Sequence, residues 1–381
     1  MIQRKLAFLL MTLLAVFLFL PPAPSAAQLK QPPPAEKLEY INASKPLPSC
    51  AFVVSGQTQG SGFLIDRSAK LLISNHHVVG RNENVIVVFP VYEKAQALVT
   101  RSYYLSKAPR IRGKVLATDP VRDLAVVQLD TVPNEVPEIP LAKEMPRAGD
   151  KTHMVGNPGD SPRAWVFAVG TVKDLRFQGM EYGGGQRVLA RIMEIEADPA
   201  FSQGASGGPA VNSAGELVGV MAAMIPKEPG KKIYIDLSEV RVFLASVERG
   251  QATAAIGQGD YDSAIQWCNR AIAVHPGDAF AFNERGVAYA AQKQYDNALS
   301  DYSAALKLDA SFTKAYRNRA AAYLGKGDAD RAVADCTAAL KLDPHYARAY
   351  LTRSKALARL GKNAESQADY QQAVKLDPTL K

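Results

Sequence analysis

The sequence contains few cysteines, with only Cys50, Cys268 and Cys336 among 381 residues. An odd count leaves at least one thiol outside any intramolecular disulfide. No histidine stands at a spacing from a cysteine that indicates a zinc site, and no base stands beside a cysteine in a pattern typical of a thiol nucleophile. We therefore expect the cysteines to be small core residues, and we expect neither a metal site nor a cofactor.

The sequence also lacks a block of charge of one sign. The formal net charge is +8, and loss of Arg4 and Lys5 by processing would lower it by two. Because basic and acidic residues are interspersed, no basic stripe predicts a nucleic-acid partner. With 47% hydrophobic and 22% charged residues, the composition is typical of a chain that folds into about two domains.

A long apolar run that would span a membrane is missing as well. The run from Leu6 to Leu20 is shorter than the about 20 residues that a spanning helix needs. It follows Arg4-Lys5 and is followed by Ser25-Ala26-Ala27, the arrangement of a secretory signal peptide. We predict a signal peptide over residues 1–27 and a Pro-rich linker over 28–49, with an uncleaved anchor as the alternative. The mature chain would then have no membrane span.

Three motifs supply the groups of a nucleophilic hydrolase, in the order His, Asp, Ser. They are Asn75-His76-His77-Val78-Val79, Arg122-Asp123-Leu124-Ala125-Val126-Val127 and Gly204-Ala205-Ser206-Gly207-Gly208-Pro209. A serine hydroxyl is a poor nucleophile unless an imidazole accepts its proton and a carboxylate orients that imidazole. The glycines let the backbone approach a substrate carbonyl, so the amides of Gly204 and Ser206 are candidates for an oxyanion hole.

These motifs resemble those of trypsin-fold serine proteases of the Do-like (HtrA-type) family over about residues 50–244. Three further matching segments are Gly60-Ser61-Gly62-Phe63-Leu64-Ile65, Thr118-Asp119-Pro120-Val121 and Val155-Gly156-Asn157-Pro158. The resemblance implies an all-β double-barrel domain over 50–244 and a serine endopeptidase with the triad His77, Asp123 and Ser206. It leaves His76 as a half-buried neighbour that hydrogen-bonds locally, and it leaves Asp119 as a turn residue.

The resemblance also indicates specificity and location. The residue six before the nucleophile lies at the base of the S1 pocket in this fold, and here it is Ala200, with Phe201 beside it. An unpaired basic side chain is costly to bury there, so we expect small or medium aliphatic P1 residues. The family implies unfolded or damaged envelope proteins as substrates, a bacterial periplasmic location and possible oligomers.

Two features depart from the family. The segment Val91 to Arg112 looks inserted between two barrel strands and is basic, with Lys94, Arg101, Lys107, Arg110 and Arg112. It would either steer acidic substrates or form a solvated surface loop, and we favour the loop. The second departure is that no PDZ-like segment follows the protease region, which removes the peptide sensor usual in the family.

From about residue 245 the sequence becomes Ala-rich and repeats every 34 residues. This period aligns four small residues, Ala264, Ala298, Ala332 and Ser366. The region resembles tetratricopeptide repeats, which implies an all-α solenoid of about four repeats over 245–381, the first of them degenerate. A helix from about Leu237 to Glu248 would connect the protease region to the first repeat.

Such a solenoid uses its first helices to line a groove that binds an extended protein or peptide partner. The groove-facing candidates are Asn283, Lys314, Arg317, Asn318, Arg348 and Lys355. These residues make the groove partly basic, which suits an acidic segment or a C-terminal carboxylate. A polar face needed only for solubility is the alternative.

Two other functions compete with an exported serine endopeptidase. The first is a latent or inactive protease domain that acts with the repeats as a protein-interaction scaffold. The second is an esterase, which shares the triad but usually carries its serine on a strand-to-helix elbow of an α/β sheet. The order of the motifs and the predicted barrel strands disfavour the esterase.

Overall fold

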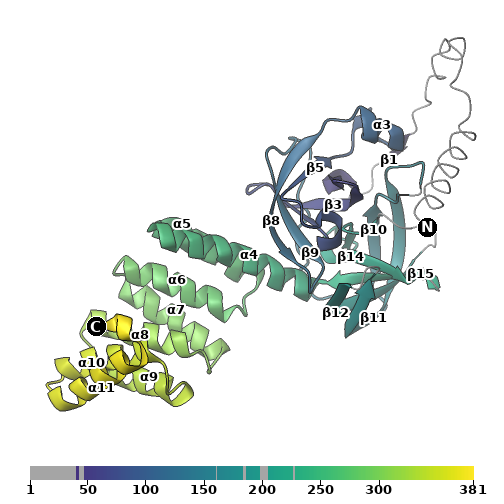
Figure 1. Cartoon of the computed structure of the whole chain (residues 1–381). Helices are drawn as coiled ribbons and strands as arrows, with labels where there is room; N and C mark the ends of the chain where they lie inside the picture. Colours follow the sequence, from purple (N-terminus) through teal and green to yellow (C-terminus); the bar gives the residue numbers. More distant parts are fainter. Residues whose placement is uncertain (1–39, 43–46, 160, 183–185, 198–204, 226–227) are drawn as a thin grey trace, which may run out of the picture. The chain divides into compact units, whose positions relative to one another are not determined.

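The computed structural model describes residues 40–42, 47–159, 161–182, 186–197, 205–225 and 228–381 (Figure 1). The predicted signal peptide lies outside these residues. Within the predicted linker, Tyr40–Asn42 forms strand β1 and Leu47–Ser49 forms the short 3-10 helix η2. No helix of the described ranges combines the length and apolar character needed to cross a bilayer.

The first half of the protease region is a closed six-stranded antiparallel barrel. Its strand order is β2 (Cys50–Ser55), β3 (Thr58–Asp66), β4 (Leu71–Ser74), β9 (Leu124–Leu129), β8 (Ile111–Asp119) and β5 (Asn84–Val88). Valine and leucine dominate these strands, and their inward side chains fill the barrel, with Val53, Leu72 and Val127 fully buried.

The second half is another closed barrel. Its strand order is β10 (Lys151–Gly156), β11 (Val166–Tyr182), β12 (Gln186–Ala197), β15 (Glu228–Asp236), β14 (Leu217–Ile225) and β13 (Pro209–Val211). Met154, Ile195 and Tyr234 lie in its core. The predicted double-barrel architecture is therefore confirmed.

An apolar layer joins the two barrels and a long helix, α4 (Leu237–Gln258). Phe63 and Val126 of the first barrel, Val220 of the second, and Val240 and Phe243 of α4 belong to one buried cluster. Burial of such side chains is worth about 1.5 to 3 kcal/mol each. The first half of α4 is thus part of the protease core.

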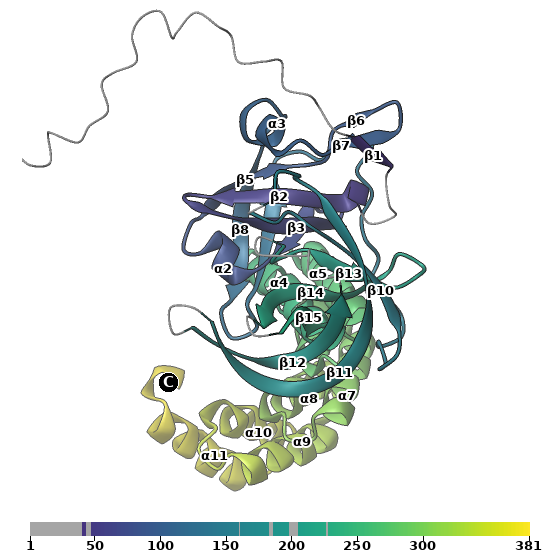
Figure 2. The same cartoon turned by 90° about the vertical axis from the view of Figure 1, so that its right-hand side faces the viewer.

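The inserted segment is structured, so the prediction of a solvated loop was wrong. It contains β6 (Tyr92–Glu93), β7 (Gln96–Leu98) and helix α3 (Arg101–Ser106), and β7 pairs with both β1 and β6 (Figure 2). The ring of Tyr104 is buried against Trp165, with ring centroids 5.5 Å apart. Large aromatic rings gain enough from burial to order a short segment, a tertiary effect that the basic composition did not reveal.

The rest of the described chain is helical, as predicted. After α4 come α5 (Tyr261–Val274), α6 (Ala279–Ala291), α7 (Tyr295–Leu308), α8 (Thr313–Lys326), α9 (Ala329–Leu342), α10 (Ala347–Arg359), α11 (Asn363–Leu376) and the 3-10 helix η3 (Pro378–Leu380). Consecutive helices pack as antiparallel pairs (Figures 1 and 2). Alanines at the aligned positions are fully buried, which lets the helices approach closely.

Helix α4 is continuous across residue 245, where we placed the start of the repeats. Its second half buries Ala252 and Ala255, and Ala255 packs with Ala264 of α5 and Ala288 of α6. Two of the cysteines, Cys268 and Cys336, are buried in α5 and α9 and form no disulfide. Burial raises the pKa of each of these two thiols to about 12, so neither supplies a thiolate at neutral pH.

An arginine–aspartate ladder runs through the repeats with the 34-residue period. Its pairs are Arg285–Asp301, Arg319–Asp335 and Arg353–Asp369. In the central pair, Arg319 Nε and Nη2 donate to the two carboxylate oxygens of Asp335 at 2.7 and 2.8 Å. Arg319 Nη1 also donates to Ser303 Oγ of the preceding repeat at 3.1 Å. Each arginine therefore ties three helices together.

Replacing Arg319 with Met is expected to lower the free energy of unfolding by about 2 to 3 kcal/mol, because it leaves the carboxylate of Asp335 unpaired. This loss of unfolding free energy is smaller than that expected for a fully buried ion pair, because a fifth of the Arg319 side chain is exposed. Urea unfolding followed by circular dichroism measures it. The double variant Arg319→Met, Asp335→Leu should recover most of the loss, and an equal loss in both variants would contradict this explanation.

Candidate functional site

The site begins with a short contact between His77 and Asp123. Helix α2 (His76–Val79) is a single turn that directly follows β4 and carries His77, while Asp123 precedes β9. The distance from His77 Nδ1 to Asp123 Oδ2 is 2.7 Å, and the backbone amide of His77 donates to Asp123 Oδ1 at 2.9 Å. Asp123 is fully buried and the His77 side chain is 31% exposed. A carboxylate in this position makes Nδ1 the donor, which leaves Nε2 as the proton-accepting nitrogen.

The turn that presents Asp123 is held on several sides. Asp123 has φ +55°, a left-handed conformation that is uncommon for residues other than glycine. Asn75 Nδ2 donates to the carbonyl oxygen of Asp123 at 2.7 Å. Asp119 Oδ1 accepts from the amides of Val121 and Arg122, each at 2.9 Å. Asp119 is the last residue of β8, directly before the predicted turn, and its side chain stabilises the backbone from which Asp123 projects.

Ser206 lies on a turn of the second barrel that is anchored to the first barrel. The amide of Ser61 on β3 donates to the carbonyl oxygen of Ser206 at 2.8 Å, and the amide of Gly207 donates to the carbonyl oxygen of Met221 at 2.8 Å. Ser206 is partly exposed, and its hydroxyl donates to the carbonyl oxygen of Ala222 at 3.4 Å, a long hydrogen bond. The hydroxyl is therefore weakly held.

The structure distinguishes the two histidines. The carboxylate of Asp123 contacts His77, the residue favoured by the sequence. His76 is half-buried, as we predicted, but its Nδ1 has no hydrogen-bond partner among the described residues. The predicted local hydrogen bonding is made by the His76 carbonyl oxygen, which accepts from the Gly80 amide at 2.7 Å.

Three of the residues predicted for the site lie outside the residues that the structure describes. Gly204 of the suggested oxyanion hole, and Ala200 and Phe201 of the suggested S1 pocket, lie in the range 198–204, which the structure does not describe. These three assignments remain predictions.

Three supporting residues escaped the sequence analysis. Asn75 holds the Asp123 carbonyl, and Ser61 holds the Ser206 carbonyl. Arg101, which we had counted among the surface charges, donates from Nη1 to Asn157 Oδ1 and to the carbonyl oxygen of Pro158, both at 2.8 Å. The amide of Asn157 in turn donates to Ser61 Oγ at 2.8 Å. All but Arg101 stand inside the quoted motifs, but nothing in their residue type specified these partners.

The groove candidates separate into two groups. Asn318 Nδ2 donates to Asn283 Oδ1 at 3.0 Å, and Arg317 Nη1 donates to Asn318 Oδ1 at 3.0 Å, so these three come together between α6 and α8. Asn283 is only 4% exposed, so its prediction as a groove-facing residue was wrong, because the packing of α8 covers it. The other three, on α8 and α10, are exposed: Lys314, Arg348 and Lys355. Burial raises the pKa of the neighbouring Glu284 carboxyl. Lys314 acts electrostatically on this carboxyl, so an acidic group lies near one of the basic residues predicted for the groove.

Family models match two parts of the chain. A trypsin-like peptidase domain matches residues 60–220, and tetratricopeptide repeats match residues 249–312, 313–346 and 347–380. The two parts correspond to the barrels and to the helical region described above.

Individual relatives agree with the first of these matches. The periplasmic serine endoprotease DegP of Salmonella typhimurium is 30% identical over 172 residues, which cover 45% of this chain and 31% of DegP. HhoA of Synechocystis sp. is 28% identical over 213 residues, which cover 56% of this chain and 48% of HhoA. This chain thus spans less than half the length of either relative.

A solved structure of the serine endoprotease from Yersinia pestis aligns with 54% of this chain and 67% of its own, at 20% identity and a TM-score of 0.40. The family models and the relatives, taken with the two barrels and the helical repeats, establish the domain composition. The chain carries a trypsin-like peptidase domain, homologous to the HtrA and DegP serine proteases, followed by C-terminal tetratricopeptide repeats.

Proposed function

We propose that this protein is a serine endopeptidase that uses Ser206 as nucleophile, His77 as general base and Asp123 as the residue that orients His77. The observation that carries the proposal is the 2.7 Å contact between His77 and a fully buried Asp123. The anchoring of the Ser206 turn to the first barrel by Ser61 supports it. The relatives are named as serine proteases and endoproteases, which supports the same chemistry.

The proposed mechanism assigns one role to each of these groups. His77 Nε2 takes the proton of the Ser206 hydroxyl as its oxygen attacks the scissile carbonyl, and Asp123 stabilises the imidazolium that forms. The protonated His77 then gives the proton to the leaving amine, and water hydrolyses the acyl-enzyme by the same route. We propose the amides of Gly204 and Ser206 as donors to the oxyanion, and Ala200 and Phe201 as the S1 pocket.

Labelling with a fluorophosphonate probe tests this function, because the probe reacts with an activated serine. We expect the wild-type chain to be labelled and Ser206→Ala and His77→Ala to be unlabelled. Two matched controls should label like wild type: Ser213→Ala, an exposed serine of the same barrel, and His76→Ala. Labelling lost in His76→Ala but kept in His77→Ala would overturn the assignment of the base.

One observation favours a second candidate, a latent protease domain that serves with the repeats as a scaffold. The Ser206 hydroxyl is directed to the Ala222 carbonyl at 3.4 Å. Labelling that occurs only after addition of an unfolded protein would indicate a switchable site. No labelling of the wild type under either condition would contradict the endopeptidase and favour the scaffold.

We also propose export to a bacterial periplasm, with cleavage after Ala27 and unfolded envelope proteins as substrates. The support is the apolar run with its charged start, together with the periplasmic DegP relatives. N-terminal sequencing of exported protein should begin at Gln28, and a chain that retains Met1 would contradict cleavage.

For the repeats we propose binding of an extended protein segment across Asn318 and the exposed cations of α8 and α10. A fluorescent Glu-rich peptide should bind in a salt-sensitive manner and lose affinity in Lys355→Glu. Binding that ignores both salt and this change would leave the polar face as a solubility feature.

A further inference from the structure

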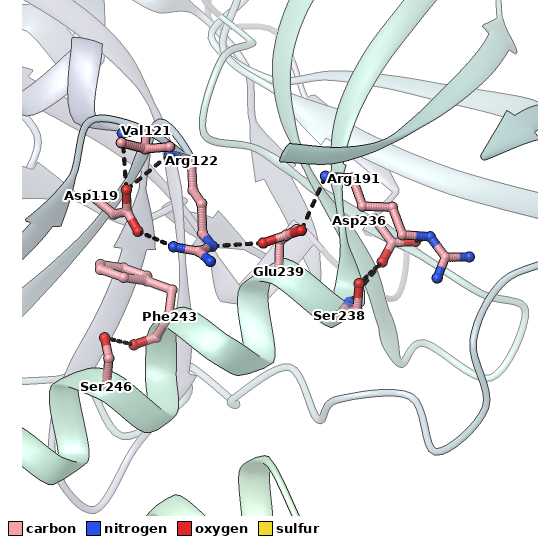
Figure 3. Close-up of polar contacts among 9 residues, drawn as sticks. All are labelled: Asp119, Val121, Arg122, Arg191, Asp236, Ser238, Glu239, Phe243 and Ser246. Atoms are coloured by element: carbon pink, nitrogen blue, oxygen red, sulfur yellow. Dashed lines mark hydrogen bonds and ion pairs between the residues drawn. The ribbon is translucent and has the colours of Figure 1, made fainter. Parts of the chain in front are cut away.

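We infer that Glu239, on the first turn of α4, is a positioning residue for Asp123, and that it acts through Arg122. This inference rests on the proposed function, because it concerns how the proposed triad is held. Figure 3 draws the contacts of Arg122 with Asp119 and Glu239 and that of Glu239 with Arg191.

The first step is the contact between helix α4 and the Asp123 turn. Arg122 precedes Asp123 in the chain, and its Nε donates to Glu239 Oε2 at 2.6 Å. Its Nη1 donates to Asp119 Oδ2 at 2.7 Å, so the guanidinium bridges two carboxylates. The Arg122 side chain is 30% exposed and that of Glu239 is 14% exposed. Charge-assisted hydrogen bonds in such partly buried positions are stronger than neutral ones.

The second step is that Glu239 also contacts the other barrel. Its Oε1 accepts from the backbone amide of Arg191 on β12 at 3.1 Å. The same strand contacts the same turn directly, because the amide of Leu189 donates to the carbonyl oxygen of Val121 at 2.8 Å. Glu239 therefore links the turn that carries Asp123 to the barrel that carries Ser206.

The third step is the conformation of the turn itself. Asp123 has φ +55°, and a residue in this strained conformation keeps it only where its surroundings hold it. Asn75 supports the turn on the C-terminal side and the Asp119–Arg122–Glu239 contacts support it on the N-terminal side. Without Glu239, we expect the carboxylate of Asp123 to lose part of its alignment with His77 Nδ1.

This arrangement has a consequence for the repeats. Glu239 is part of a helix that extends to Gln258, and the second half of that helix packs in the first repeat. Arg270 on α5 also donates to Asp66 of β3 at 2.6 Å and to Glu248 of α4 at 2.8 Å. The repeats are therefore joined to the same helix that supports the Asp123 turn.

The test measures two quantities for the full chain: the rate of fluorophosphonate labelling and the fraction of protein that is finally labelled. We expect Glu239→Ala and Arg122→Ala each to be slower by about 10- to 100-fold, as for a small misplacement of a catalytic group, with an unchanged final fraction. The double variant should be slowed by less than the product of the two single effects, because both changes break the same Arg122–Glu239 contact. Glu239→Gln retains one acceptor oxygen, which can accept from Arg122 but not also from the Arg191 amide, so it should recover only part of the rate.

The matched control is Arg241→Ala. Arg241 lies on the same helix and donates from Nη2 to the carbonyl oxygen of Ala142, so its loss weakens the attachment of α4 without touching the Asp123 turn. We expect Arg241→Ala to be labelled at a rate within about twofold of the wild-type rate. If Glu239→Ala labels no more slowly than Arg241→Ala, the inference is wrong.

The pH dependence of the rate separates positioning from simple loss of folded protein. A poorly aligned Asp123 stabilises the imidazolium less, so the acid limb of the rate profile should move to lower pH in Glu239→Ala. A pH–rate profile of Glu239→Ala that superimposes on that of the wild type would show that Glu239 only stabilises the fold. A final labelled fraction that falls in proportion to the rate would show the same. If wild type itself does not label, the proposed function fails and the inference falls with it.

Discussion

The variant Asp123→Asn is expected to slow labelling of Ser206 by about 10⁴-fold, as loss of the orienting carboxylate does in the triad mechanism. Asp123 accepts two hydrogen bonds, one from His77 Nδ1 and one from the His77 amide. An asparagine side chain has only one acceptor atom, so its NH₂ group must face one of these donors. If the NH₂ group faces the ring, the proton moves to Nε2, and His77 no longer accepts the proton of Ser206.

A matched control is Asp130→Asn, an exposed aspartate just after the other end of β9. It makes the same chemical change without entering the site, and we expect the wild-type rate. Both variants should show the circular dichroism of the wild type. A loss of less than about tenfold in Asp123→Asn would mean that His77 is not oriented by this carboxylate during the reaction.

The variant Gly207→Ala is expected to slow labelling by more than about 100-fold, because it displaces the Ser206 turn. Gly207 has φ +86°, and a Cβ atom there would lie 2.1 Å from the carbonyl oxygen of Ser61 and 2.8 Å from Ser74 Oγ. Neither neighbour can move easily, since Ser74 Oγ donates to that same carbonyl at 2.7 Å. The methyl group would therefore break the contact that anchors the turn to the first barrel.

Gly149→Ala separates the backbone effect from the clash. Gly149 has φ +96° but open space around the position of a Cβ atom. It should cost only the left-handed conformation, about 1 to 2 kcal/mol of stability, and leave the labelling rate of folded protein unchanged. Comparable loss of labelling in both variants would indicate that backbone strain, rather than the Ser61 contact, explains the effect of Gly207→Ala.

Much of this protein was predictable because its signals are local or periodic. The resemblance of the His77, Asp123 and Ser206 motifs to those of trypsin-fold serine proteases implied the double barrel, and these motifs are short and local. The 34-residue period predicted the helices, because each repeat buries the same small residues against its neighbours. The inserted segment was predicted wrongly, because the burial of Tyr104 against Trp165 depends on residues about 60 positions apart in the sequence.

The arginine–aspartate ladder shows what the sequence predicts and what only the packing of the helices reveals. Arginines recur at Arg285, Arg319 and Arg353 with the period of the repeat, so the sequence alone contains the pattern. Only the packing of α8 on α9 shows that Arg319 pairs with Asp335, sixteen residues away. In the first repeat the equivalent positions hold Gln251 and Trp267. These two side chains are uncharged, so they cannot form the ion pair of the later repeats.

The sequence by itself determined the two domain types and the identity of the three residues proposed for catalysis, since motif order and periodicity do not depend on distant contacts. The tertiary structure alone decided how those residues are held. Asn75, Ser61 and Glu239 act through hydrogen bonds to turns that lie far from them in the chain. A hydrogen bond requires a distance of about 3 Å and a suitable angle, and only the packing of the barrels and α4 supplies both.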